Sequence, residues 1–169
     1  MYDIYLSMGC RGLPSFEDLA EKIPIVQTLE FQQKILTPSP HHPGFLGLDL
    51  SEPVVKLLFQ RLQSTRAVGY WLLSDYRQPR ITREQARLLA EPAIAERAVN
   101  HFQRHPDDTL GPIEFVGVQP EFWVFGARSE YLIRENCVPG DLRVSVDTLD
   151  GHIWTREDFD RRAKRLGWY

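Results

Sequence analysis

Three strand-like segments follow one another in the second half of the chain, and a helix start stands on either side of them. The segments are rich in β-branched and aromatic residues and comprise residues 113–118, 122–126 and 142–147. Thr82 stands three residues before Gln85, and Thr155 three residues before Asp158, as in the capping box that opens a helix. Strands that follow one another without a helix between them pair antiparallel. This half of the chain therefore predicts a β-meander between two helices.

Strand-like and helix-like segments alternate in the first half. Strands are expected over residues 2–8, 25–36 and 67–73. Ser15 can cap a short helix that ends near Pro24, and Ser51 can cap a second helix with Pro53 in its first turn. Residues 37–44 hold three prolines and one glycine, which predicts a loop. The predicted buried stripe of the second helix consists of Val54, Leu57, Leu58 and Leu62.

The long helical stretch after the first capping box contains a proline. Apolar residues keep helical spacing over residues 86–102, but Pro92 removes a backbone donor from the interior. We therefore expect two shorter helices. Further on, Asp150 and Gly151 predict a tight turn, and Gly167 predicts the end of the last helix.

The order of these elements predicts an α+β fold. A length of 169 residues fits one domain, so we expect residues 1–169 to form a single α+β domain. The run of three consecutive strands departs from a strict strand–helix alternation. We expect one mixed or mainly antiparallel sheet, with the helices packed on one face.

Charge, hydropathy and cysteine content exclude several classes of protein. The chain has 20 basic and 23 acidic residues, a net charge of -3, so no overall positive field would attract nucleic acid. No stretch approaches the roughly 18 apolar residues that cross a membrane, and the N-terminus lacks a secretory signal. Cys10 and Cys137 are too few for a disulfide scaffold. We expect a soluble cytoplasmic protein with reduced thiols, no cofactor, and neither membrane nor nucleic acid as partner.

The most chemical-looking segment contains Asp147, Asp150 and His152 at the end of a predicted strand. Two carboxylates and an imidazole in six residues are the groups of an acid–base pair or a metal site. In that hypothesis His152 acts as base or ligand and a carboxylate orients it. The alternative is structural, because Asp-Gly is a preferred turn pair and Asp147 can bind the amides of the turn.

Two pairs of histidines and one cysteine are weaker candidates. His101 and His105 lie one helical turn apart, a spacing that can hold a metal, although histidine is also favoured at a helix C-terminus by the helix dipole. His41 and His42 lie in the proline-rich loop, where an ordinary solvated role is the alternative. Cys10, beside a cationic arginine, is a possible nucleophile or a small apolar filler. No bound metal is expected from these signals alone.

Aromatic residues offer a possible binding surface. Bulky rings occupy both faces of two predicted strands, so one face either lies under a helix or contacts a partner. These residues, with the two rings at the end of the chain, are Tyr70, Trp71, Trp123, Phe125, Trp168 and Tyr169. We expect Trp168 and Tyr169 to be docked rather than free, because each can bury about 150 to 250 Å². In the last helix, acidic residues four positions before Arg161 and Arg162 predict an exposed face with internal ion pairs.

The sequence carries no motif of recognised catalytic chemistry. Its size, slight negative charge and lack of such a motif favour a non-enzymatic protein-binding module, such as a bacterial immunity or adaptor protein, that recognises another protein or itself. The alternative is a small hydrolase or metal-assisted enzyme that uses Asp147, Asp150 and His152.

Overall fold

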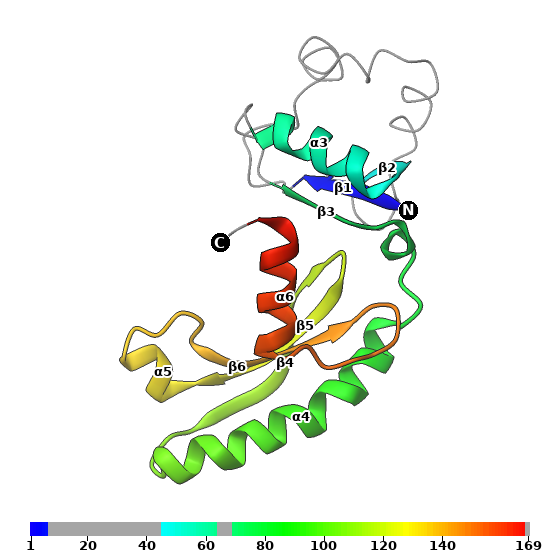
Figure 1. Ribbon diagram of the computed structural model, residues 1–169. Helices are drawn as coiled ribbons and strands as arrows, with labels where there is room; N and C mark the ends of the chain where they lie inside the picture. Colours follow the sequence, from blue (N-terminus) through cyan, green and yellow to red (C-terminus); the bar gives the residue numbers. More distant parts are fainter. Residues whose placement is uncertain (7–44, 64–68, 168–169) are drawn as a thin grey trace. The chain divides into compact units, whose positions relative to one another are not determined.

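The computed structural model describes residues 1–6, 45–63 and 69–167, which form two compact units (Figure 1). The first unit lies within Met1–Gln78 and the second within Pro79–Tyr169. The helix predicted from Ser15 and the strand over residues 25–36 lie outside the described residues, as do Cys10, His41, His42, Trp168 and Tyr169. The expectation of one domain over the whole chain stays a prediction.

The first unit is a three-stranded antiparallel sheet with a helix against it. Its strands are β1 (Tyr2–Leu6), β2 (Phe45–Leu50) and β3 (Gly69–Leu73), in the order β2-β1-β3. The helix α3 (Glu52–Gln63) contacts β1 and β3, and a short 3-10 helix, η2 (Ser74–Arg77), follows the sheet. The core contains Ile4, Leu48, Val55, Leu58, Phe59, Trp71 and Leu72.

The buried stripe of α3 is shifted by one residue from the predicted one. Val55, Leu58 and Phe59 are buried, whereas Leu57 is 54% exposed. Val54 is half-buried, and the side chain of Leu62 lies outside the described set. Both stripes have helical spacing, but the observed one buries the phenyl ring of Phe59, which removes more apolar area from water than an additional leucine would.

The second unit contains the predicted meander. Its elements are α4 (Arg83–Arg104), β4 (Leu110–Gln119), β5 (Phe122–Ser129), α5 (Glu130–Arg134), β6 (Asp141–Asp147) and α6 (Arg156–Leu166). The strands pair antiparallel in the order β4-β5-β6. Both predicted capping boxes are present, at Thr82 with Gln85 and at Thr155 with Asp158. α6 ends at Gly167, which has a left-handed backbone as predicted.

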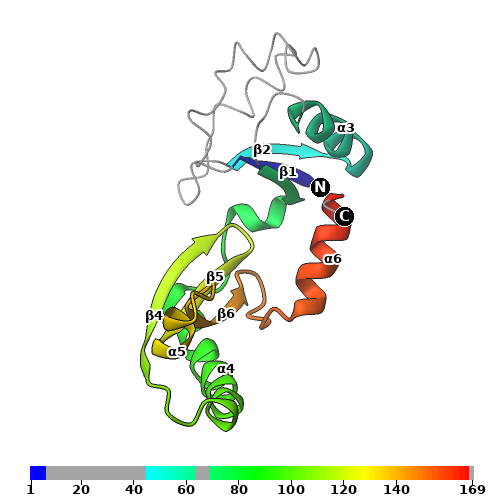
Figure 2. The same ribbon diagram turned by 90° about the vertical axis from the view of Figure 1, so that its left-hand side faces the viewer.

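Two helices lie on opposite sides of the second sheet (Figures 1 and 2). The core under α4 consists of Ala86, Ala90, Ile94, Phe125, Ala127, Val144 and Val146. On the other side, Phe159 of α6 meets the ring of Phe122 at a centroid distance of 5.6 Å. Residues of β5 alternate between these two faces, as in any strand.

The predicted break at Pro92 is wrong, because α4 is one helix of 22 residues with Pro92 inside it. Ala86 and Ala90, before the proline, and Ile94, after it, are all buried against the same sheet. Packing of this single stripe outweighs the loss of one backbone hydrogen bond. Pro92 itself is exposed, so its ring faces no core side chain.

The α+β class and the antiparallel pairing are confirmed, but the described strands form two sheets of three instead of one sheet. The division follows Gln78, where the first compact unit ends. α5 was not predicted, since its five residues are too few to show a helical period.

Candidate functional site

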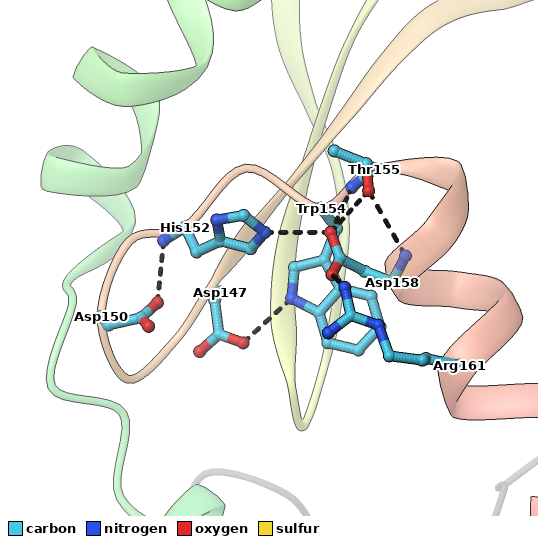
Figure 3. Close-up of polar contacts among 7 residues, drawn as sticks. All are labelled: Asp147, Asp150, His152, Trp154, Thr155, Asp158 and Arg161. Carbon is cyan, nitrogen blue, oxygen red and sulfur yellow. Dashed lines mark hydrogen bonds and ion pairs between the residues drawn. The ribbon is translucent and has the colours of Figure 1, made fainter. Parts of the chain in front are cut away.

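Asp147, Asp150 and His152 lie at the turn after β6, but their side chains contact different partners (Figure 3). Asp147 donates its backbone N–H to the carbonyl of His152 at 2.8 Å, and Gly151 donates to the carbonyl of Asp147 at 3.1 Å. Gly151 has a φ of 79°, a backbone conformation that favours glycine. The predicted tight turn is therefore present.

The side chain of Asp147 stabilises this turn through hydrogen bonds. Its buried carboxylate accepts a hydrogen bond from the backbone N–H of Leu149 at 2.8 Å through Oδ1. Through Oδ2 it accepts the indole N–H of the buried Trp154 at 2.9 Å. These contacts fit the structural alternative, in which the aspartate binds the amides of the turn.

Asp150 and His152 have partners other than Asp147. Asp150 accepts the backbone N–H of His152 at 2.9 Å, while the half-exposed imidazole of His152 places Nε2 2.9 Å from Oδ2 of Asp158. Figure 3 shows the side chains of Asp147 and His152 directed to these different partners. The three predicted groups therefore do not converge, and the geometry gives the hydrolase hypothesis no support.

Asp158, in the first turn of α6, forms hydrogen bonds and an ion pair with several neighbouring residues. It accepts hydrogen bonds from the backbone N–H and the hydroxyl of Thr155, at 2.8 and 2.7 Å, and pairs with Arg161 at 2.8 Å. The hydrogen bond with His152, followed by those from Thr155, holds the pKa of the Asp158 carboxyl well below its usual range. The sequence indicated Asp158 as a helix cap, but nothing local indicated that His152 would be its partner.

His101 and His105 also have structural partners. Nε2 of His101 lies 2.6 Å from Oδ2 of Asp108, and the ring of His105 stacks on Tyr131 at a centroid distance of 3.8 Å. The two imidazole centroids are 4.9 Å apart. Within residues 1–6, 45–63 and 69–167, no group of three histidine, cysteine or acidic side chains is placed to hold a metal.

Asp108 connects the end of α4 to the start of α5. Its side chain is 1% exposed and accepts the hydroxyl of Ser129 at 2.6 Å and the backbone N–H of Tyr131 at 2.7 Å, besides contacting His101. Burial alone would raise the pKa of Asp108, but these hydrogen bonds outweigh it and lower the pKa to about 2. His101 is therefore part of a buried hydrogen-bonded cluster with Asp108, Ser129 and Tyr131, which we call the clamp at Asp108.

The predicted aromatic binding residues lie mostly in the interior. Tyr70, Trp71 and Phe125 are buried, and Trp123 is partly buried, with its indole N–H donated to the carbonyl of Ile81 at 2.9 Å. The rings of Tyr70, Trp71 and Phe125 are therefore not accessible for direct contact with a partner. Their pattern on both faces of the strands reflects cores inside the protein rather than an open face.

An exposed apolar row lies instead on β4, the edge strand of the second sheet. Phe115, Val116 and Val118 are 42%, 40% and 41% exposed, and we call these three residues the β4 edge. On the opposite border of the sheet, β6 is bridged by Ile153, which pairs with Val146. The sequence predicted a strand here but not its place at the border, which depends on long-range pairing.

The hairpin that carries the β4 edge is anchored to α6 by a buried carboxylate. Glu121, in the turn between β4 and β5, pairs with Arg162 at 2.5 Å and with Arg165 at 3.0 Å. Burial raises the pKa of Glu121, while the two arginines act in the opposite direction. The expectation that Arg162 belongs to a solvated face is therefore wrong, because it reaches this buried acid instead of a helix neighbour.

Comparisons of the chain with protein-family models, characterised proteins and solved structures gave no match. Among the helices that the structure describes, none combines the length and the apolar character needed to cross a membrane.

Proposed function

We propose that this chain is a non-enzymatic protein-binding module of the adaptor or immunity kind and that the β4 edge is its docking surface. The exposure of Phe115, Val116 and Val118 on an edge strand carries the proposal. Apolar side chains on both faces of one strand are typical of a strand inside a sheet, where neighbours cover them. At a border, the same pattern fits a strand that a partner completes.

Strand addition at a sheet edge is a common mode of protein recognition, because main-chain hydrogen bonds supply affinity and alternate side chains supply specificity. β4 has ten residues, enough for such pairing. Pro112 lacks a backbone N–H, which limits the pairing segment to residues 113–119. The anchoring of the hairpin through Glu121 supports the proposal further, since a rigid edge loses little entropy on binding.

We propose the cytoplasm as the place of action, because two cysteines in 169 residues are too few for the disulfide scaffold that is typical of small secreted domains.

The proposal is tested by selecting extended peptides from a display library against the purified chain and mapping their binding by amide hydrogen exchange. We expect selected peptides to protect the amides of residues 113–119 and to lose binding to the Val116→Lys variant. Val99→Lys is the matched control, because it makes the same substitution at an exposed valine, 59% against 40% for Val116, that lies on α4 instead of β4. Protection confined to the turn around His152, or loss of binding in both variants, would contradict a docking role for the β4 edge.

A further inference from the structure

We infer that the partner of the β4 edge is a second copy of this chain, paired antiparallel with the first about a two-fold axis between Val116 and Gly117. This inference rests on the proposed docking role of the β4 edge and names its occupant. Figure 2 shows β4 along the outer border of its sheet. Pairing two such borders would give a continuous antiparallel sheet of six strands.

The faces of the β4 side chains follow from its register with β5. Phe115 pairs with Phe125 and Val118 with Trp123, and both partners belong to the side of the sheet that α4 covers. Residues three apart share this face because the register shifts between Phe115 and Gly117.

The opposite face is defined by the outer ends of the same segment. Glu114 pairs with Gly126 and Gln119 with Phe122, and both of these β5 positions alternate with the α4-facing ones. Glu114 and Gln119 therefore share the face away from α4.

An axis between Val116 and Gly117 places side chains of the same face opposite each other. Phe115 then lies opposite Val118 of the second copy, an aromatic–β-branched pair of the kind that stabilises antiparallel sheets. Glu114 lies opposite Gln119 of the second copy, where a carboxylate can accept a hydrogen bond from an amide. Because the axis is two-fold, each pair occurs twice.

Charge selects this register over the nearest alternative. Glu114 is the one charged residue of β4. A two-fold axis through Glu114 would also match the faces, since it places Ile113 opposite Phe115 of the second copy, but it would put two carboxylates directly opposite each other. Like charges in that position are destabilising.

The bulge is compatible with pairing to a second copy. A bulge increases the local right-handed twist of an edge strand. The second copy carries the same bulge at the same place, and the symmetry axis passes through it. The two strands therefore have matching twist.

The experiment uses sedimentation equilibrium of the full chain and three surface variants at low ionic strength. Gln119→Lys creates two opposite-charge pairs with Glu114 and should lower the dimer dissociation constant roughly twofold to thirtyfold. Gln119→Glu creates two like-charge pairs and should raise it by a similar factor. The double variant Glu114→Lys with Gln119→Glu should restore attraction. All three effects should shrink as salt is added.

A measurement without variants keeps the inference falsifiable if one variant misfolds. Amide hydrogen exchange of the unmodified chain should slow over residues 113–119 as protein concentration rises. A chain that is monomeric at every concentration, or a dimer that responds equally to both Gln119 variants, would overturn the inference. If the chain is monomeric but selected peptides still bind the β4 edge, only the second copy is excluded. If no peptide binds either, the docking role fails as well.

Discussion

Arg77 contacts both oxygens of the buried Asp3 carboxylate, through Nε and through a terminal nitrogen at 2.6 Å. The same carboxylate accepts the backbone N–H groups of Leu48 and Asp49 at 2.7 and 2.9 Å. The β1–β2 register is irregular opposite Asp3, and Asp49 has a positive φ of 50°. Asp3 thus supplies the acceptor that the interrupted ladder lacks and joins β1, β2 and η2.

Replacing Arg77 by glutamine should destabilise the protein by about 1–3 kcal/mol, because the buried charge of Asp3 would keep only its two backbone donors. Urea unfolding followed by circular dichroism measures the change. Arg87→Gln is the matched control, since Arg87 forms an exposed ion pair with Glu91 at 3.0 Å, worth about 0.5 kcal/mol or less. Equal losses in the two variants would show that Arg77 does not compensate a buried charge.

The clamp at Asp108 predicts a dependence of stability on pH. The pKa of Asp108 is lowered from 3.8 to about 2, so its contribution to stability is complete above pH 3.8 and is lost as the pH falls toward 2. Asp108→Asn should therefore be less stable at neutral pH and should show a shallower fall in stability over that range. Unfolding curves across the range test this, with the exposed neighbour Asp107→Asn as control. Identical slopes in the wild type and Asp108→Asn would refute the role of the clamp.

Local sequence signals predicted the structure where the contacts themselves are local. The hydrogen bonds of both capping boxes, of the Asp150–Gly151 turn and of the left-handed Gly167 join residues no more than five positions apart. The meander was predicted as well, because short turns leave neighbouring strands little choice of partner.

Contacts between distant residues were not predictable in this way. Asp3 and Arg77 are 74 positions apart, and nothing near either residue indicates the other. Likewise, helical spacing permits two phases for the stripe of α3, and only the sheet beneath it decides between them. For the candidate site, sequence proximity grouped Asp147 with His152, whereas the fold directs them to Trp154 and Asp158.

The uninterrupted α4 predicts that Pro92 costs stability without shaping the fold. Pro92→Ala should restore the backbone hydrogen bond to the carbonyl of Leu88 and raise stability by up to about 3 kcal/mol, the usual penalty for proline inside a helix. Thermal unfolding measures the gain. Ala95→Ser, at an exposed position of the same helix, is a control that alters helix propensity only slightly. A lower melting temperature for Pro92→Ala would mean that the packing of α4 requires a bend at the proline.

Gly151 and Gly167 both have a positive φ, and comparing their substitutions by alanine distinguishes the cost of backbone strain from the cost of a steric clash. Gly167 has a φ of 69°, and no atom of the described residues lies within 4 Å of the place where a Cβ would stand, so Gly167→Ala should cost about 1–2 kcal/mol from the left-handed backbone. Gly151 has a φ of 79°, but its Cβ would lie 2.7 Å from Cδ1 of Leu89. Gly151→Ala should therefore cost more, by up to about 1–3 kcal/mol of overpacking. Leu89→Ala in the Gly151→Ala background should recover the difference, because it removes the opposing methyl group. Urea unfolding of the three variants tests this, and equal costs for the two glycine substitutions would show that α4 does not press on the turn that carries His152.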